Sequence, residues 1–295
     1  MSTIQTRAHR RSADRTPTGF VRRHPITAFL AWFFTVGQAV AFVPVVAAAN
    51  GIELMAQPFV VASTLVGLLL PAVVITRIVE GPERVRELWR SSFAVGVPLR
   101  WYVLALVGVP LLATALAVAF FGLPAAGSSI LTAVVLGLLL QTVLALIPNN
   151  LFEEVAWMGF VQARLQDRYR SPLRAALVVG PLFALQHVSL VVGQGTTGLL
   201  LLGMLVVLAV PFRAALAWTY NRTGSLFLVG LVHAAGNAAA GGSGFGDGML
   251  PRLYPDAGFV GLMHLLAFGV IGLVLMVATR GRLGFPRRTP SEEQS

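Results

Sequence analysis

Long runs of apolar residues alternate with short polar segments along most of the chain. A helix that spans the hydrocarbon core of a bilayer needs about 20 mostly apolar residues. The runs of roughly that length lie at 27–49, 58–79, 101–121, 129–152, 175–192, 198–219, 225–240 and 258–279. The pattern predicts an all-α fold, a polytopic transmembrane bundle of about eight spanning helices. The seventh run is short and rich in Gly and Ala, so its end is the least defined.

Arginines gather in every second segment between the apolar runs. The basic segments are the N-terminal 1–25, the loops at 80–100 and 162–174, the turn at Arg222 and the residues after 279. The segments at 50–57, 122–128 and 193–197 contain no arginine, and 241–256 contains only Arg252. Because cytoplasmic loops of membrane proteins carry an excess of basic residues, both termini are predicted to be cytoplasmic.

The same patterns divide the chain into five parts. They are a disordered basic cytoplasmic tail at 1–25, membrane helices at 26–125, a central core at 126–245, a last loop and helix at 246–280, and a disordered tail at 281–295. Within them, "VRELWRSSFAV" predicts an amphipathic helix at the membrane interface. "VQARLQDRYRSPL" predicts a cytoplasmic extension of the fourth helix, and its Pro172 marks the turn into the fifth.

Composition supports a membrane protein and narrows its partners. Of 295 residues, 56% are hydrophobic and 12% are charged, about half the charged fraction of a soluble domain. The net charge is +10, but the basic residues are spread over the ends of apolar runs, so membrane lipid is expected as a partner and nucleic acid is not. The chain has no Cys, which excludes disulfides and thiol nucleophiles. The first apolar run is too long for a signal peptide, so we expect a multi-pass protein of the cell membrane.

A few polar residues interrupt the apolar runs, where each of them is costly. They are Gln141, Asn149, Asn150, Glu153, Glu154, Gln186, His187, His233, Asn237 and His264. Helical rise and topology place Glu153, His187, His233 and Asn237 at comparable depth on the cytoplasmic side. His264 lies near the outer end of the last helix and is expected to be structural, and the two asparagines after Pro148 are expected to satisfy a helix break.

Spacing assigns these residues to faces. His233 and Asn237 are i, i+4 and share one helix face. Glu153 and Glu154 diverge by about 100°, so we expect different tasks for them. A carboxylate and an imidazole can deprotonate water, while a second imidazole and an amide can donate to an oxyanion. The set Glu153, His187 and His233 can also bind Zn or another divalent metal, although HExxH is absent.

"EEVAWMG", "FALQH" and "HAAGN", in this order, resemble the EExxxR, FxxxH and HxxxN motifs of the CAAX protease and bacteriocin-processing family. That family includes the type II CAAX prenyl endopeptidases, and the resemblance covers about 150–240. It implies an intramembrane endopeptidase acting on a membrane-associated peptide or protein substrate, with prenylated CAAX-type chains among the candidates. Glu153 would activate water with help from His187, and His233 and Asn237 would stabilise the oxyanion. Metal-dependent and metal-free mechanisms both stay open.

One position departs from the pattern. Met158 stands where the motif has arginine, four residues after Glu154, and that arginine would be the natural ion-pair partner of Glu154. Glu154 is therefore expected to be protonated, paired elsewhere or turned to the interface. Two other functions stay open: a catalytically degenerate relative serving as immunity factor or scaffold, and a transporter with a Glu/His proton relay. The inverted repeats typical of transporters are not evident.

Overall fold

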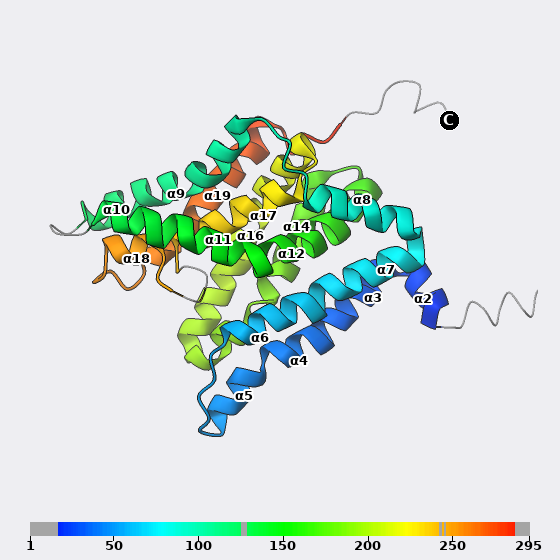
Figure 1. Ribbon diagram of the computed structural model, residues 1–295, viewed down its shortest axis with the longest axis horizontal. Coiled ribbons are helices and arrows are strands. Elements are labelled where there is room, and N and C mark those ends of the chain that lie inside the picture. Colours follow the sequence, from blue (N-terminus) through cyan, green and yellow to red (C-terminus); the bar gives the residue numbers. More distant parts are fainter. Residues whose placement is uncertain (1–16, 125–128, 242–243, 245, 287–295) are drawn as a thin grey trace, which may run out of the picture. The chain divides into compact units, whose positions relative to one another are not determined.

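The computed structural model in Figure 1 describes residues 17–124, 129–241, 244 and 246–286. Every regular element in these residues is a helix, which confirms the predicted all-α class. Contacts divide the chain into two units, Met1–Arg90 and Ser91–Ser295, and the five-part division made from the sequence stays a prediction. Most of the predicted tails lies outside the described residues, but Pro17–Arg23 forms helix α2 instead of a disordered segment.

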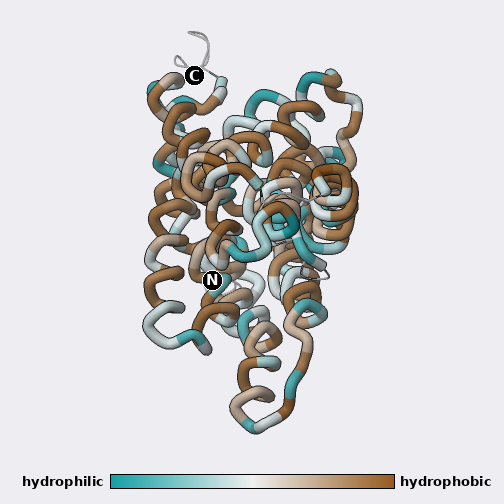
Figure 2. The backbone as a smooth tube through the Cα atoms, turned by 90° about the vertical axis from the view of Figure 1, so that its left-hand side faces the viewer, coloured by the Kyte–Doolittle hydropathy of each residue, from teal (hydrophilic) through white to brown (hydrophobic). Residues whose placement is uncertain are grey.

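In the part of the chain that the structure describes, five helices are long and apolar enough to cross a membrane: Gln57–Glu80, Leu99–Phe121, Ile130–Tyr169, Val188–Thr223 and Val260–Ala278. A sixth span results if the bent pair Pro25–Ala41 and Val43–Ala49 counts as one. Figure 2 shows hydrophobic residues along nearly all of these helices. The chain is thus built as an integral membrane protein, while the cytoplasmic placement of its termini stays a prediction.

The fifth and seventh predicted spans are shorter than expected. Helices α14 (Pro172–Leu185) and α17 (Leu226–Ala239) have 14 residues each, fewer than the roughly 20 that a simple span needs. After α14 the chain leaves helical geometry at Gln186 and His187 before α15 (Val188–Val191) begins. The predicted span at 175–192 is therefore a broken helix, and both short helices carry predicted site residues.

The first unit is a pair of adjoining helical arms. Its elements are α2, α3 (Pro25–Trp32), a π-helical segment (Phe33–Gly37), α4 (Gln38–Ala41), α5 (Val43–Ala49), α6 (Gln57–Ala62), a second π-helical segment (Ser63–Leu69), α7 (Leu70–Glu80) and α8 (Pro82–Ser92). The arms meet at Gly37 and Gly67, where a Cβ on Gly67 would lie 2.5 Å from the Gly37 Cα. Small residues allow such close helix packing in membranes. Helix α8 matches the predicted amphipathic helix, with Arg84 paired to Glu80 and Glu87.

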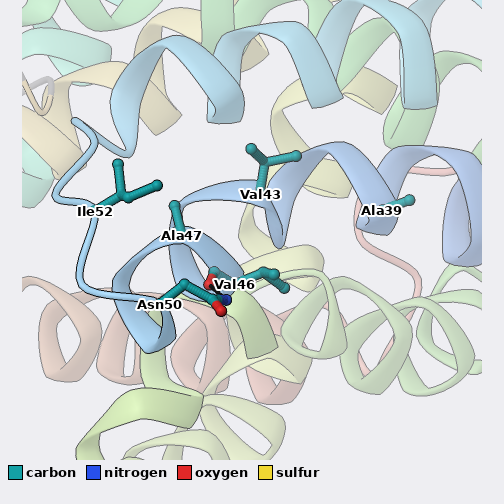
Figure 3. A pocket seen from close by; sticks show the side chains of 6 residues that line it. All are labelled: Ala39, Val43, Val46, Ala47, Asn50 and Ile52. Atoms are coloured by element: carbon teal, nitrogen blue, oxygen red, sulfur yellow. Dashed lines mark hydrogen bonds between the residues drawn. The ribbon is translucent and has the colours of Figure 1, made fainter.

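The same unit has a hollow of about 400 Å³ between α4, α5 and the following turn (Figure 3). It is lined by Ala39, Val43, Val46, Ala47, Asn50 and Ile52. The Asn50 amide already donates to the Val46 carbonyl at 2.8 Å. This hollow contains no acid and no imidazole, and none of the predicted site residues, so we do not assign it a function.

The second unit contains one long, kinked rod. The rod consists of α10 (Ile130–Thr132), a π-helical segment (Ala133–Leu140), α11 (Gln141–Ala145), a further π-helical segment (Leu146–Asn150), α12 (Leu151–Glu154), the π-helical segment Val155–Gln162 and α13 (Ala163–Tyr169). The unit also contains α9 (Leu99–Phe121), α14, α15, α16 (Gly195–Thr223), α17, α18 (Met249–Leu253) and α19 (Met263–Ala278). The rod leaves helical geometry at Ile147 (φ −123°, ψ 121°), which is the helix break expected near Pro148.

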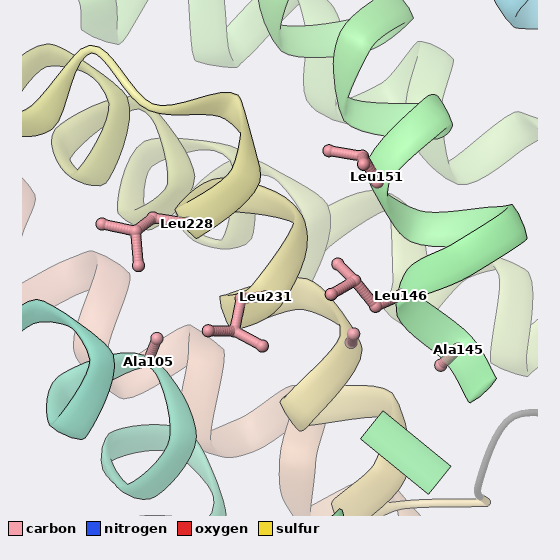
Figure 4. Packing of buried hydrophobic residues seen from close by; sticks show 7 residues of the cluster. Ala105, Ala145, Leu146, Leu151, Leu228 and Leu231 are labelled. Atoms are coloured by element: carbon pink, nitrogen blue, oxygen red, sulfur yellow. The ribbon is translucent and has the colours of Figure 1, made fainter. Parts of the chain in front are cut away.

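An apolar cluster fixes the rod against α17 at the kink. Leu146 and Leu151, on either side of it, pack with Leu228 and Leu231 of α17 and with Ala105 of α9 (Figure 4). The approach is close, because a Cβ on Gly230 would lie 3.0 Å from the Leu151 Cα. His233 lies three residues after Gly230, so this contact places it beside the glutamates of α12.

Candidate active site

The two glutamates of α12 face different partners, as their angular separation predicted. Both are buried: the exposed fraction is 4% for Glu153 and 0% for Glu154. Glu153 is held by amides, whereas Glu154 is held by a guanidinium and an imidazole. Because unpaired carboxylates are strongly disfavoured in a low-dielectric interior, these partners are what allows two adjacent acids to be buried here.

Two amide groups hold the carboxylate of Glu153. Asn150 Nδ2 donates to Oε2 at 2.9 Å, and Gln186 Nε2 donates to Oε1. The Trp157 indole in turn donates to Gln186 Oε1 at 2.6 Å. An indole N–H can only donate, so the Gln186 oxygen must face Trp157 and its amide nitrogen must face Glu153. Trp157 thereby sets which end of the Gln186 amide reaches the glutamate.

Glu154 forms a fully buried ion pair with Arg213 of α16. Arg213 Nη1 lies 2.9 Å from Oε1 and 2.8 Å from Oε2, and both side chains are 0% exposed. Gln162 completes the arrangement, since its Oε1 accepts from Arg213 Nε at 2.9 Å. Because Met158 stands in place of the motif arginine, Glu154 was expected to be protonated, paired elsewhere or turned to the interface. In the structure it is paired elsewhere, with an arginine from another helix.

His233 of α17 lies between the two glutamates. Its Nδ1 is 3.0 Å from Glu154 Oε1 and 3.9 Å from Glu153 Oε2. A carboxylate that faces a guanidinium accepts hydrogen bonds, so we assign the Nδ1 proton to the bond with Glu154. Nε2 then carries the lone pair and faces Asn150 Nδ2 at 3.4 Å.

Asn150 joins the rod to α17 at the centre of the cluster. Its amide nitrogen reaches Glu153 and faces His233, and its carbonyl oxygen accepts from Asn237 Nδ2 at 3.3 Å. Asn150 was expected to satisfy the helix break rather than bind substrate, and the structure adds that its side chain also bonds within the cluster. The predicted juxtaposition of Glu153, His233 and Asn237 is present.

His187 lies at the break between α14 and α15, at the edge of the cluster. Its Nδ1 is 3.2 Å from the Phe183 carbonyl, which can only accept, so Nε2 is left for other partners. The Phe183 ring contacts both imidazoles, with ring centroids 5.2 Å from His187 and 5.8 Å from His233. Irregular backbone at membrane depth is tolerated where it lines a polar site.

The cluster is closed at one end and accessible at the other. Arg213 and Glu154 are completely buried, whereas Gln186, His187 and Asn237 are partly exposed. Glu153 and His233 lie between these ends, each 4% exposed. The accessible side of the cluster is therefore that of His187 and Asn237, and the ion pair lies at its closed end.

The donor atoms are not arranged as a metal site. Within the described ranges, no group of three or more His, Asp or Glu side chains could hold a metal ion. The predicted set Glu153, His187 and His233 is therefore not assembled, since both Glu153 oxygens face amide N–H groups and His233 Nδ1 faces Glu154. This arrangement does not fit Zn, and we route no chemical step through a metal.

Sequence reasoning missed three contributors. Arg213 lies in the middle of the sixth apolar run, in "LAVPFRAALAW". The apolar run predicted a span there, and Arg213 had no role of its own in that prediction. A single arginine inside an apolar run is itself a signal, because such a charge needs a partner. Gln186 was noted as polar and buried, but its link to Glu153 was not foreseen, and Gln162 was placed in the cytoplasmic extension. His264, as expected, stays outside the cluster, with Nδ1 against the Gly261 carbonyl.

Comparison with curated proteins gives no match. A family model does match: residues 135–239 fit the model described as type II CAAX prenyl endopeptidase Rce1-like. This segment contains all of the predicted site residues as well as Arg213, Gln186 and Asn150. The resemblance carried by the three motifs is thus confirmed: the region from the rod to α17 is similar to the Rce1-like type II CAAX prenyl endopeptidases over residues 135–239.

Proposed function

We propose that this protein is an intramembrane endopeptidase that hydrolyses peptide bonds of membrane-associated peptides or proteins, prenylated CAAX-type chains among them. The observation that carries the proposal is the environment of Glu153, a buried carboxylate oriented by two amides beside His233 and Asn237. The family match over 135–239 supports the reaction class.

In this proposal Glu153 is the general base. Each of its oxygens receives one N–H and keeps a further lone pair for a water molecule. As Glu153 takes a proton from the water, the water oxygen bonds to the scissile carbonyl carbon and the carbonyl electrons move onto its oxygen. When the C–N bond then breaks, the departing amine takes the proton from Glu153.

Asn237 and His233 stabilise the oxyanion from α17. The Asn237 amide is a ready donor at the accessible end of the cluster. His233 donates through Nε2 in its imidazolium form, with the second proton taken from solvent before the substrate binds, since its Nδ1 is engaged with Glu154. His187, whose Nε2 is left available, assists in orienting the water. Donors held in place before the reaction are what makes such a site effective.

The membrane supplies both surroundings and substrate. Large apolar side chains on the long helices, such as Leu111, Val207 and Val277, are exposed and are proposed to contact membrane lipid. We further propose a cell-membrane location with the site toward the cytoplasmic side, on the arginine pattern, and no nucleic-acid partner. The Arg213 ion pair removes the main reason for a catalytically degenerate scaffold, because Met158 no longer leaves Glu154 without a cation.

The test is cleavage by protein purified in detergent micelles, with a prenylated peptide and an unprenylated membrane-anchored peptide as substrates. Glu153→Ala and His187→Ala are expected to lower the rate by at least about 100-fold, while His264→Ala, which removes an imidazole outside the cluster, leaves it unchanged. Equal rates in all four proteins, or no cleavage of either substrate by the unsubstituted protein, would refute the proposal.

A further inference from the structure

Arg213 is held by two side chains that flank Met158 on the rod. Glu154 lies four residues before Met158, and Gln162 lies four residues after it. Four residues are close to one turn in both the α-helical and the π-helical parts of the rod, so the three residues lie in a row near one side of it. Arg213 bonds to both ends of this row, through Nη1 to Glu154 and through Nε to Gln162. Its guanidinium thus lies along the row, and Met158 is the middle residue of that row.

Close backbone packing brings Arg213 to this place. On the side of α14, a Cβ on Gly180 would lie 2.9 Å from the Val210 backbone of α16. On the side of α19, a Cβ on Gly272 would lie 2.0 Å from the Pro211 carbonyl oxygen. Both contacts lie within three residues of Arg213 and leave α16 little freedom to shift. The position of the guanidinium is therefore set by glycine contacts as well as by its own bonds.

The ion pair is continuous with His233. Glu154 Oε1 accepts from Arg213 and also from His233 Nδ1. The rings of Phe183 and Phe212 lie 5.4 Å and 5.9 Å from the guanidinium carbon, and the same rings contact His233 with centroids 5.8 Å and 5.0 Å away. A change at Arg213 therefore reaches His233 through a shared carboxylate oxygen and through two shared rings.

We infer that Arg213 is a positioning residue, which supplies from α16 the cation that the family's motif has at position 158 and which holds His233 through Glu154. Positions 158 and 213 are two alternative sources of one positive charge beside Glu154. Met158 is apolar and fully buried, so it adds no second charge there. The effect of Arg213 on catalysis rests on the proposed function, whereas its effect on His233 does not.

The first test needs no activity. Protein with ¹⁵N-labelled histidine is observed by NMR in micelles, and the His233 signal is identified by its loss in His233→Gln. Arg213→Met is expected to change the tautomer signature of His233. The relocated-charge variant Arg213→Met/Met158→Arg is expected to restore it, and Arg222→Met, at an exposed arginine of the same helix, leaves it unchanged.

A folded Arg213→Met variant with the original His233 signature would overturn the inference, and so would a double variant that fails to restore it. If Arg213→Met does not fold, the double variant alone decides: a folded protein with the original signature supports the inference, and an unfolded one overturns it. If the His233 signature changes in Arg213→Met but the unsubstituted protein has no peptidase activity, the proposed function is refuted and this inference is still supported.

The second test measures turnover on the substrate that is cleaved. Arg213→Met is expected to lower kcat by about 100-fold or more with KM nearly unchanged, because Arg213 acts behind the reacting groups. The double variant is expected to recover kcat to within about tenfold of the unsubstituted protein. A purely structural role predicts that folded Arg213→Met keeps its kcat and loses only stability, and that result would contradict a positioning role.

Discussion

Arg213 and Glu154, 59 residues apart in the sequence, form an ion pair in which both side chains are completely inaccessible to solvent. The pair stands behind the cluster of Glu153, His233 and Asn237. Arg213 supplies the positive charge that Met158, an apolar residue, does not provide. Through Glu154, the pair orients the imidazole of His233, which faces Glu153.

The buried pair predicts a strongly non-additive stability cycle. Arg213→Met is expected to lower the free energy of unfolding by about 3 kcal/mol or more, because Glu154 is left as an unpaired buried charge. Glu154→Gln/Arg213→Met is expected to recover most of this loss. Reversible unfolding in micelles measures all members of the cycle, and additive losses would show that the two side chains do not depend on each other.

Trp157→Phe removes the indole N–H that orients Gln186 and keeps an aromatic ring in the same place. The Gln186 amide is then free to turn its oxygen toward Glu153, so we expect the peptidase rate to fall about tenfold with little change in stability. Trp101→Phe, which alters a ring contact with Trp218, is the matched control. An unchanged rate in Trp157→Phe would mean that Gln186 keeps its orientation without the indole.

Asn150→Asp replaces the central amide by a carboxylate of nearly the same shape. It removes the donor to Glu153 Oε2 and puts a second acid beside it, where like charges disfavour each other. We expect a loss of peptidase activity of at least about 100-fold, while Asn149→Asp, on the neighbouring residue, has a much smaller effect. Similar rates in both variants would place Asn150 outside the machinery.

Gly236 is where α17 meets α19, since a Cβ there would lie 2.4 Å from the Phe268 ring. Gly236→Ala is expected to destabilise the protein by about 1–3 kcal/mol through overpacking. Gly241→Ala is the control, because a Cβ at that residue has no neighbour within 4 Å. Thermal unfolding in micelles compares the two, and equal midpoints would show that α19 moves aside without cost.

Helical rise and arginine placement predicted comparable depth for Glu153, His233 and Asn237, and the three side chains lie in one cluster. These residues lie on regular helices whose depth follows from topology. His187 was predicted at the same depth and lies at the edge of the cluster. The break in the helix at Gln186 and His187 could not be read from an apolar sequence.

The partners that the site residues find on distant helices could not be predicted from the sequence. Met158 was read as a missing cation because a local i+4 partner is visible in sequence, whereas Arg213 comes from a distant helix whose packing is set by Gly180 and Gly272. The bonds of Asn150 to Glu153 and Asn237 could not be read from the sequence, because its side-chain direction depends on the kink at Ile147. Two of the eight predicted spans, α14 and α17, are shorter apolar helices in the structure, and an apolar sequence does not reveal where such helices end.

The most direct measurement of the central claim is mass spectrometry of the cleavage products formed in H₂¹⁸O. Hydrolysis by a Glu153-activated water predicts one ¹⁸O atom in the new carboxyl terminus made by the unsubstituted protein, and no such product with Glu153→Gln above the uncatalysed background. Equal amounts of labelled product from both proteins, or no product from either, would contradict the assignment of Glu153 as the base of an intramembrane endopeptidase.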